Sequence, residues 1–260
     1  MRTLLRPRWL LAHLVILALA VTCVSLGFWQ LRRLDERRTY NRTLTEHATL
    51  PVLPVEQLLA DVPPADAAYR RVTARGAFDA ANEIILLSRS RNSVAGNHVV
   101  TPLVLGDGSA VLVDRGWVPF QHDTPPVAEA APPDGEVLVR GTLFPSQTRG
   151  RFGPQEEPGP LHSVFRIDTG RLAPQMPYPI VPVWLLLEQQ QPTQRGGLPL
   201  SVELPRPDAG PHLFYAIQWF LFALIGLIGY PLVVRARLRE RRPIPDVEPA
   251  ERDAKVSEPS

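Results

Sequence analysis

The chain contains six histidines, which are its strongest candidates for metal or proton chemistry. Three of them fall in expected loops, where solvated side chains are the plainest interpretation: His47, His122 and His162. His98 opens an expected strand and is interpreted as a turn or edge residue. His13 lies near the start of one long apolar segment, and His212 stands immediately before another. His212 therefore has the position that best suits a functional role.

An imidazole at the edge of an apolar segment suits haem, because histidine nitrogen is a strong ligand for haem iron. In that position His212 could hold the haem ring in the apolar layer while the propionates face water. The alternative is that His212 begins a helix and hydrogen-bonds backbone or lipid headgroups. On the residues alone, this second interpretation is favoured over haem ligation.

Small residues recur on one face of each apolar segment when both are read as helices. The row that runs inward from His212 contains Ala216, Trp219, Ala223 and Gly226. The row on the first segment contains Ala20, Cys23, Gly27 and Gln30. Small side chains let a helix or a flat ligand approach closely, so we expect the two faces to meet. An antiparallel pair would then cluster Trp29, Gln30 and His212 at one end, although the tryptophans could equally be membrane anchors.

The sharpest feature between the apolar segments is Arg115-Gly116-Trp117, which ends the run Val111-Leu112-Val113-Asp114. A glycine between two large residues at a strand end predicts a bulge or a close backbone approach. In the structural interpretation, Trp117 fills the base of the domain and Arg115 pairs with an acid. In the functional one, the arginine and the ring face a partner or a ligand carboxylate. The structural interpretation is favoured.

Composition and motifs exclude several classes of protein. The net charge of +2 does not suit a nucleic-acid binder. The single cysteine, Cys23, excludes an intramolecular disulfide and a cysteine-based zinc site. The chain has no P-loop, no dinucleotide-binding glycine pattern and no hydrolase or zinc-protease motif. An enzyme is therefore the less favoured class.

Two apolar segments, 10–31 and 212–234, are long enough to cross a bilayer. A signal peptide cleaved near Ala18-Leu19-Ala20 is the alternative for the first, but the apolar run continues to residue 31. Arginines next to the segments are more numerous on the side of the two chain ends. We therefore expect a bacterial plasma-membrane protein with a cytoplasmic N-terminus (1–9), an outer domain (32–211) and a disordered cytoplasmic tail (235–260).

The expected outer domain is rich in short strand-like runs bounded by glycine, proline, asparagine or aspartate. The runs are 69–78, 83–88, 98–105, 110–118, 136–144 and 181–188. Gly106-Asp107-Gly108 predicts a hairpin, and short helices are expected at 55–59 and 168–172. The predicted fold class is an α+β membrane protein, in which two transmembrane helices flank a mostly antiparallel, barrel- or sandwich-like domain.

Five sequence blocks together resemble the surfeit locus protein one family, also called Shy proteins. The blocks are LGFWQLRR at 26–33, YRRV at 69–72 with GAF at 76–78, VTPL at 100–103, VLVDRGWVP at 111–119 and HLFYAIQWF at 212–220. Three departures stand out. Asp114 occupies a position where the family often has asparagine, and Asp35, Glu36 and Arg37 stand where it often has a tryptophan and a lysine. The long arginine-rich tail after the second apolar segment also looks specific to this chain.

The resemblance implies an assembly factor for haem-copper cytochrome c oxidase, not an enzyme. Such a protein would bind haem a transiently and help its insertion into the catalytic subunit. His212 matches the family's proposed ligand to the haem iron, and Trp29, Gln30, Ala216 and Trp219 would line the cofactor site. The implied partners are the oxidase catalytic subunit, the enzyme that synthesises haem a and membrane lipid. The alternatives are a scaffold for an oxidase subunit that binds no haem, and a receptor or enzyme with an unrelated ligand.

Overall fold

The computed structural model describes residues 7–150, 153–156, 158–204 and 207–240. The chain forms two compact units. The helical unit comprises Met1–Arg37 and Ala209–Ser260, and the sheet unit comprises Arg38–Asp208.

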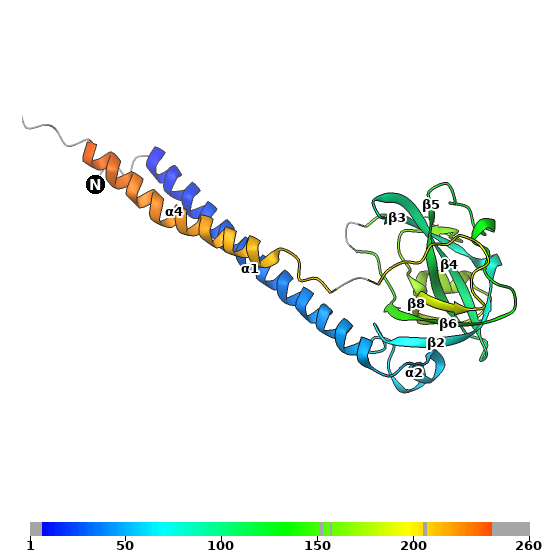
Figure 1. Ribbon diagram of the computed structural model, residues 1–260. Coiled ribbons are helices and arrows are strands. Elements are labelled where there is room, and N and C mark those ends of the chain that lie inside the picture. The colour runs from blue at the N-terminus through cyan, green and yellow to red at the C-terminus, as the bar shows by residue number, and fades with distance from the viewer. Residues whose placement is uncertain (1–6, 151–152, 157, 205–206, 241–260) are drawn as a thin grey trace, which may run out of the picture. The chain divides into compact units, whose positions relative to one another are not determined.

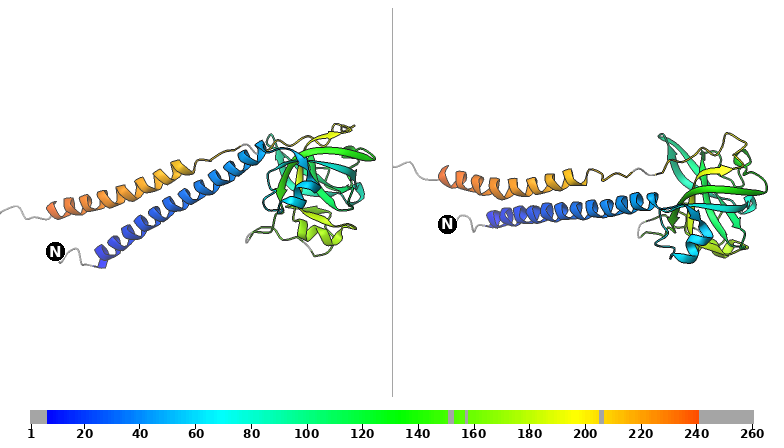
Figure 2. Two further views of the ribbon diagram at one scale, coloured as in Figure 1. Left: turned by 90° about the horizontal axis from the view of Figure 1, so that it is seen from below. Right: turned by 60° about the horizontal axis from the view of Figure 1, so that its bottom comes forward.

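The helical unit contains α4 (His212–Glu240) and most of α1 (Pro7–Thr49), whose last residues, from Arg38, belong to the sheet unit. The two helices run side by side (Figures 1 and 2). Both are long and apolar enough to cross a membrane. Their outward side chains are apolar and exposed, as at Leu14 (63%) and Leu227 (68%). Such a surface is stable in lipid and unfavourable in water.

Both helices are longer than the predicted spans. The segment that follows residue 31 is charged but rich in good helix formers, so α1 continues to Thr49. For the same reason α4 continues through Arg235, Arg237 and Arg239 to Glu240, which makes the start of the expected disordered tail helical. The rest of that tail, 241–260, lies outside the described residues.

Among the described residues, the strands of the sheet unit form a single sheet (Figure 1). That sheet has eight strands. Its strands are β1 (Leu53–Pro54), β2 (Arg71–Phe78), β3 (Ile84–Arg91), β4 (Val94–Leu105), β5 (Ala110–Pro119), β6 (Glu136–Pro145), β7 (Ser163–Val164) and β8 (Ile180–Gln191). The short helices are α2 (Val55–Asp61) and α3 (Thr169–Leu172), with 3-10 turns at Ala80–Asn82, Ala128–Ala130 and Ala173–Gln175. Each predicted strand run overlaps one of these strands, and both predicted short helices are present.

The sheet is mixed, so the prediction of a mostly antiparallel domain was wrong. Its strand order is β1-β2-β6-β8-β5-β4-β3-β7, and the pairs β1–β2, β3–β7 and β5–β8 run parallel. Strand β8 follows a long connection and enters between β5 and β6, antiparallel to β6 but parallel to β5. Hydrophobic patterns identify strands but not the partners of strands distant in sequence. An additional pairing of β2 with β4 links β2, β6, β8, β5 and β4 in a closed circuit.

The predicted hairpin joins β4 to β5. Gly108 has a φ of +83°, a value that glycine adopts without strain. The backbone N–H and the hydroxyl of Ser109 both donate to Asp107 Oδ1, at 2.9 and 2.7 Å. The turn aligns β4 and β5 along nearly their whole length, which fixes the register of the two strands that carry the polar groups described below.

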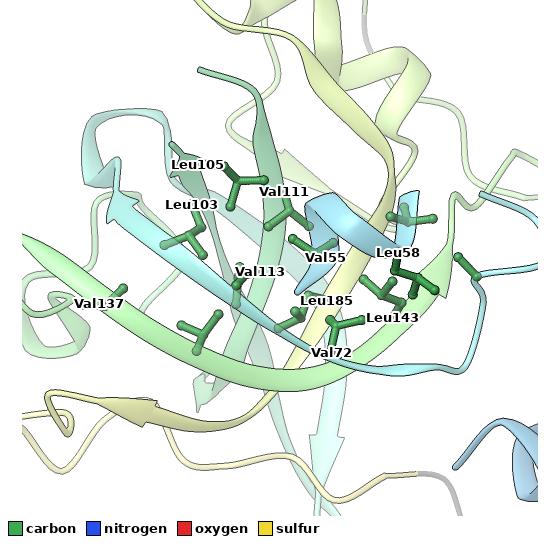
Figure 3. Close-up of a cluster of buried hydrophobic side chains, with 14 residues drawn as sticks. Val55, Leu58, Val72, Leu103, Leu105, Val111, Val113, Val137, Leu143 and Leu185 are labelled. Atoms are coloured by element: carbon green, nitrogen blue, oxygen red, sulfur yellow. The ribbon is translucent and has the colours of Figure 1, made fainter. Parts of the chain in front are cut away.

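Strand β5 is buried on both sides, which explains its continuous apolar sequence. Val111 and Val113 pack into the larger hydrophobic cluster, together with Val55 and Leu58 of α2 (Figure 3). Leu112 points the other way, into a second cluster that contains Trp184. Burying one such aliphatic side chain stabilises the folded state by about 1.5–3 kcal/mol. Because β5 is buried on both sides, it is a fixed support for the polar side chains that it carries.

Candidate functional site

His212 begins α4, and its ring is held by Gln30 of α1. Nδ1 of His212 lies 2.8 Å from Oε1 of Gln30. An amide oxygen can only accept, so Nδ1 carries the proton and a neutral ring has its lone pair on Nε2. Gln30 is 9% exposed and His212 is half-buried. Within the described part of the chain Nε2 makes no hydrogen bond, so the arrangement offers this nitrogen to a ligand.

Small residues bring the two helices together next to this pair. Ala216 is 1% exposed, and Gly27 is buried against Phe220. A Cβ atom at Gly27 would lie 2.6 Å from the Phe220 ring, so only glycine fits without a shift of that ring. Phe28 contacts the same ring edge-on, with 5.4 Å between centroids. The absence of a side chain at residue 27 therefore sets the close approach of α1 and α4.

The structure brings together most of the residues that the helical periodicity singles out. The buried or half-buried positions of α4 include His212, Ala216, Trp219, Ala223 and Gly226. Those of α1 include Ala20, Cys23, Gly27 and Gln30. Trp29 differs, because consecutive helical residues point about 100° apart. It is 46% exposed, and among the described residues no ring contact or hydrogen bond joins it to His212.

A second polar pair, which sequence reasoning missed, lies at the other end of the helices. The Tyr230 hydroxyl lies 2.6 Å from Nδ1 of His13, and the two rings meet edge-on at 5.5 Å. Both residues continue the rows that contain Gln30 and His212, so helical spacing was the available signal. With a rise of about 1.5 Å per residue, the two pairs are about 26 Å apart. They therefore bracket the apolar part of the helix pair.

In the sheet unit, the predicted bulge occurs at Arg115-Gly116-Trp117. The register of β5 against β4 shifts between Val99 and Val100, which leaves Arg115 as the extra residue. Gly116 has a φ of +138°, and a Cβ there would lie 2.4 Å from the Leu200 carbonyl oxygen. Trp117 is 6% exposed, and its backbone exchanges hydrogen bonds with Leu200.

Arg115 is buried and pairs with an acid. Its guanidinium donates to Glu83 at 3.4 Å and to Gln194 Oε1 at 2.9 Å, and it lies over the Phe78 ring. Burial lowers the pKa of Arg115 to about 10, although Glu83 opposes the shift. Burial also raises the pKa of Glu83, against hydrogen bonds from Val127 and Thr101 and the charge of Arg115. These contacts place Arg115-Gly116-Trp117 in the framework of the domain.

His98 corrects another expectation, because it is neither a turn nor an edge residue. It lies within β4, is 8% exposed, and pairs with Asp114 of β5 at 2.8 Å. The strand begins four residues earlier than predicted, which moves His98 into its interior. The sequence pattern held no signal for this contact, because it depends on the β4–β5 register and on the bulge.

The chain is similar to known proteins over most of its length. The family model described as the SURF1 family matches residues 17–224. A SURF1-like protein of Mycobacterium tuberculosis, itself uncharacterised, is 30% identical over 247 residues, which cover 92% of this chain and 88% of the relative. A SURF1-like protein of Rickettsia felis is 25% identical over 227 residues, with coverages of 86% and 96%. Human Surfeit locus protein 1 is 30% identical over 173 residues, with coverages of 58% and 55%.

Proposed function

The chain belongs to the SURF1 family, and on that premise we propose that it is a non-enzymatic assembly factor for haem-copper cytochrome c oxidase. In this proposal it holds haem a transiently and helps its insertion into the catalytic subunit. The oxidase catalytic subunit and the enzyme that synthesises haem a are its partners.

The single observation that supports haem binding is the Gln30–His212 hydrogen bond of 2.8 Å. Ligand histidines commonly donate their other ring N–H to a fixed acceptor, which orients the ring and makes the coordinating nitrogen more basic. Gln30 supplies such an acceptor, so the residues present fit the group. His212 would hold the iron through Nε2, and the buried Ala216 and half-buried Trp219 continue the same helix face. Bound haem a would supply the iron and the conjugated ring that the oxidase needs.

The location is part of the proposal. Two apolar helices that expose aliphatic side chains support a membrane protein. We place it in the bacterial plasma membrane, with both termini in the cytoplasm and the sheet unit outside. The excess of arginines next to the two chain ends supports this orientation.

A scaffold that steadies an oxidase subunit without haem is the second candidate. The observation in its favour is the His13–Tyr230 pair, a histidine hydrogen bond that links the same two helices at their other end. Polar side chains often serve only to join membrane helices. If Gln30 and His212 do no more than this, residue 212 needs no iron-binding nitrogen.

Visible absorption of the detergent-purified full chain, co-expressed with haem a synthesis, separates the two candidates. We expect a haem a spectrum in the wild type, its loss in His212→Ala and its retention in His13→Ala. His13→Ala is the matched control, because it removes a histidine that links the same helices. A wild type without haem would favour the scaffold. Haem retained in a folded His212→Ala chain would keep the function and overturn the assignment of the ligand.

A further inference from the structure

A cavity of about 490 Å³ lies within the sheet unit, and its described lining residues all belong to that unit. Its lining comes from β3, β4, β5, β6 and β8, from Tyr40 near the end of α1, and from connecting segments at Tyr69, 146–147 and 202–203. Its volume is within the range of cavities that bind small molecules, which is about 300–1,000 Å³.

The His98–Asp114 pair forms a polar part of the cavity wall. Their side chains are 10% and 3% exposed, and His98 Nδ1 lies 2.8 Å from Asp114 Oδ2. The other carboxylate oxygen accepts a hydrogen bond from the Gly116 N–H at 3.2 Å, which fixes the carboxylate. A carboxylate can only accept, so Nδ1 donates. Among the described residues Nε2 of His98 has no hydrogen-bond partner, and His98 lines the cavity.

Two bulges aim polar side chains at this cavity. The bulge at Arg115 leaves Asp114 on the side of His98. A second register shift, between Leu86 and Arg89 of β3, contains Ser88 at a φ of +59°. It turns Arg89 to the cavity, where its guanidinium donates to the Phe165 carbonyl at 3.0 Å. Bulges that re-aim side chains are common next to binding sites.

Four aromatic rings form another part of the wall. Tyr40 meets Tyr69 edge-on at 5.2 Å, and Tyr69 meets Phe144 in the same way at 5.5 Å. Phe144 stacks on Trp184 with 4.7 Å between centroids and 18° between planes. The backbone of Tyr69 is in the left-handed region, with a φ of +64°, which is strained for an aromatic residue. Such strain persists where the surrounding structure enforces it, often at ligand sites.

We propose that this cavity binds a neutral, planar aromatic molecule that carries a ring hydroxyl or ring carbonyl, the chemistry shared by quinols and quinones. The aromatic wall contacts the ring, and Nε2 of His98 bonds its oxygen. A neutral imidazole accepts from a ring hydroxyl, and an imidazolium donates to a ring carbonyl. Binding alone is proposed, with no redox step.

The charges of the lining favour a neutral ligand over a porphyrin with two propionates. The described lining contains two acidic side chains, Asp114 and Glu203, and one arginine, Arg89. Arg89 is already bonded to Phe165. Two more carboxylates would thus enter a site with no surplus of positive charge, which opposes binding in a partly desolvated cavity.

Isothermal titration of the full-length chain in detergent tests the proposal, with menadione and, under anaerobic conditions, menadiol as probes. We expect at least one to bind, and His98→Ala to weaken binding by at least about tenfold. Tyr40→Ala, which removes part of the aromatic wall and leaves the His98–Asp114 pair unchanged in sequence, should also weaken binding. The matched control is His122→Ala, because His122 also lies near a carboxylate, Glu129 at 3.4 Å.

Three results would overturn the proposal: no binding of either probe by the wild type, unchanged binding by both His98→Ala and Tyr40→Ala, or equal weakening by His122→Ala. Tyr40→Ala keeps the test decisive if His98→Ala fails to fold. A parallel titration with haemin is done in the His212→Ala chain. The proposed ligand class would be wrong if the His212→Ala chain binds haemin but neither quinone probe, and if adding His98→Ala to that chain abolishes the haemin binding. None of these results depends on whether His212 binds haem a.

Discussion

At the scale of residues, the helix pair contains two histidine hydrogen bonds with different consequences. Oε1 of Gln30 can only accept, so it fixes the proton of His212 on Nδ1. The Tyr230 hydroxyl can donate or accept, so it leaves the tautomer of His13 open. Only the first pair thus presents a ring nitrogen in a defined state to a ligand.

Removal of the acceptor should weaken haem binding without abolishing it. We expect Gln30→Leu to lower the affinity for haem a by about 10–100-fold, the usual effect of losing a residue that orients a metal ligand. Tyr230→Phe, which removes the hydroxyl at the other end, should leave the affinity unchanged. Titration of the purified chain followed by visible absorption measures both. Equal affinity of Gln30→Leu and the wild type would contradict a role for Gln30 in orienting His212.

A second prediction at this scale concerns two Arg–Glu pairs of the sheet unit. Glu83→Ala should lower the free energy of unfolding by about 3–5 kcal/mol, because it leaves the charge of Arg115 buried without its acid. The control is Glu136→Ala, whose pair with Arg75 has a similar separation of 3.3 Å, with side chains 62% and 67% exposed. Loss of that pair should cost about 0–1 kcal/mol. Urea titration monitored by circular dichroism measures both, and equal losses would contradict a buried charge at Arg115.

At the scale of elements, the bulge of β5 does two things at once. It turns Arg115 toward Glu83 and leaves Asp114 next to His98. Gly116 makes this possible through its φ of +138° and its contact with the Leu200 carbonyl. The framework of the domain and the wall of the cavity therefore depend on one backbone irregularity.

Gly116→Ala should destabilise the domain by about 1–3 kcal/mol or more, because a Cβ is strained at this φ and also collides with backbone. Gly106→Ala is the matched control. Gly106 lies in the turn that precedes the same strand, and nothing lies within 4 Å of a Cβ there. We expect a change of under about 1 kcal/mol for the control. Thermal unfolding in detergent compares the two, and similar midpoints would argue that the bulge can relax.

At the scale of the whole molecule, the local parts of the fold could be predicted from the sequence. Helical spacing placed Gln30, Ala216 and His212 on facing rows because neighbours on a helix are fixed by the chain itself. The strand runs were also recognisable, because local composition and the turn residues that flank each run identify a strand without knowledge of its partners. The insertion of β8 between β5 and β6 could not be predicted, because it joins segments distant in sequence. The His98–Asp114 contact needs the same non-local register and a bulge, so no periodicity indicates it.

The orientation of the whole chain gives a last prediction. In a background of Cys23→Ala, single cysteines are placed at Gly106→Cys in the exposed β4–β5 turn and at Ala236→Cys near the end of α4. If the sheet unit lies outside and the termini inside, a membrane-impermeant maleimide labels residue 106 in intact bacterial spheroplasts. Residue 236 should be labelled only after permeabilisation, because α4 separates it from the reagent. The reverse pattern would invert the topology. Labelling of both residues in intact cells would mean that α4 does not cross the membrane, and a haem ligand at His212 would then lose its apolar surroundings.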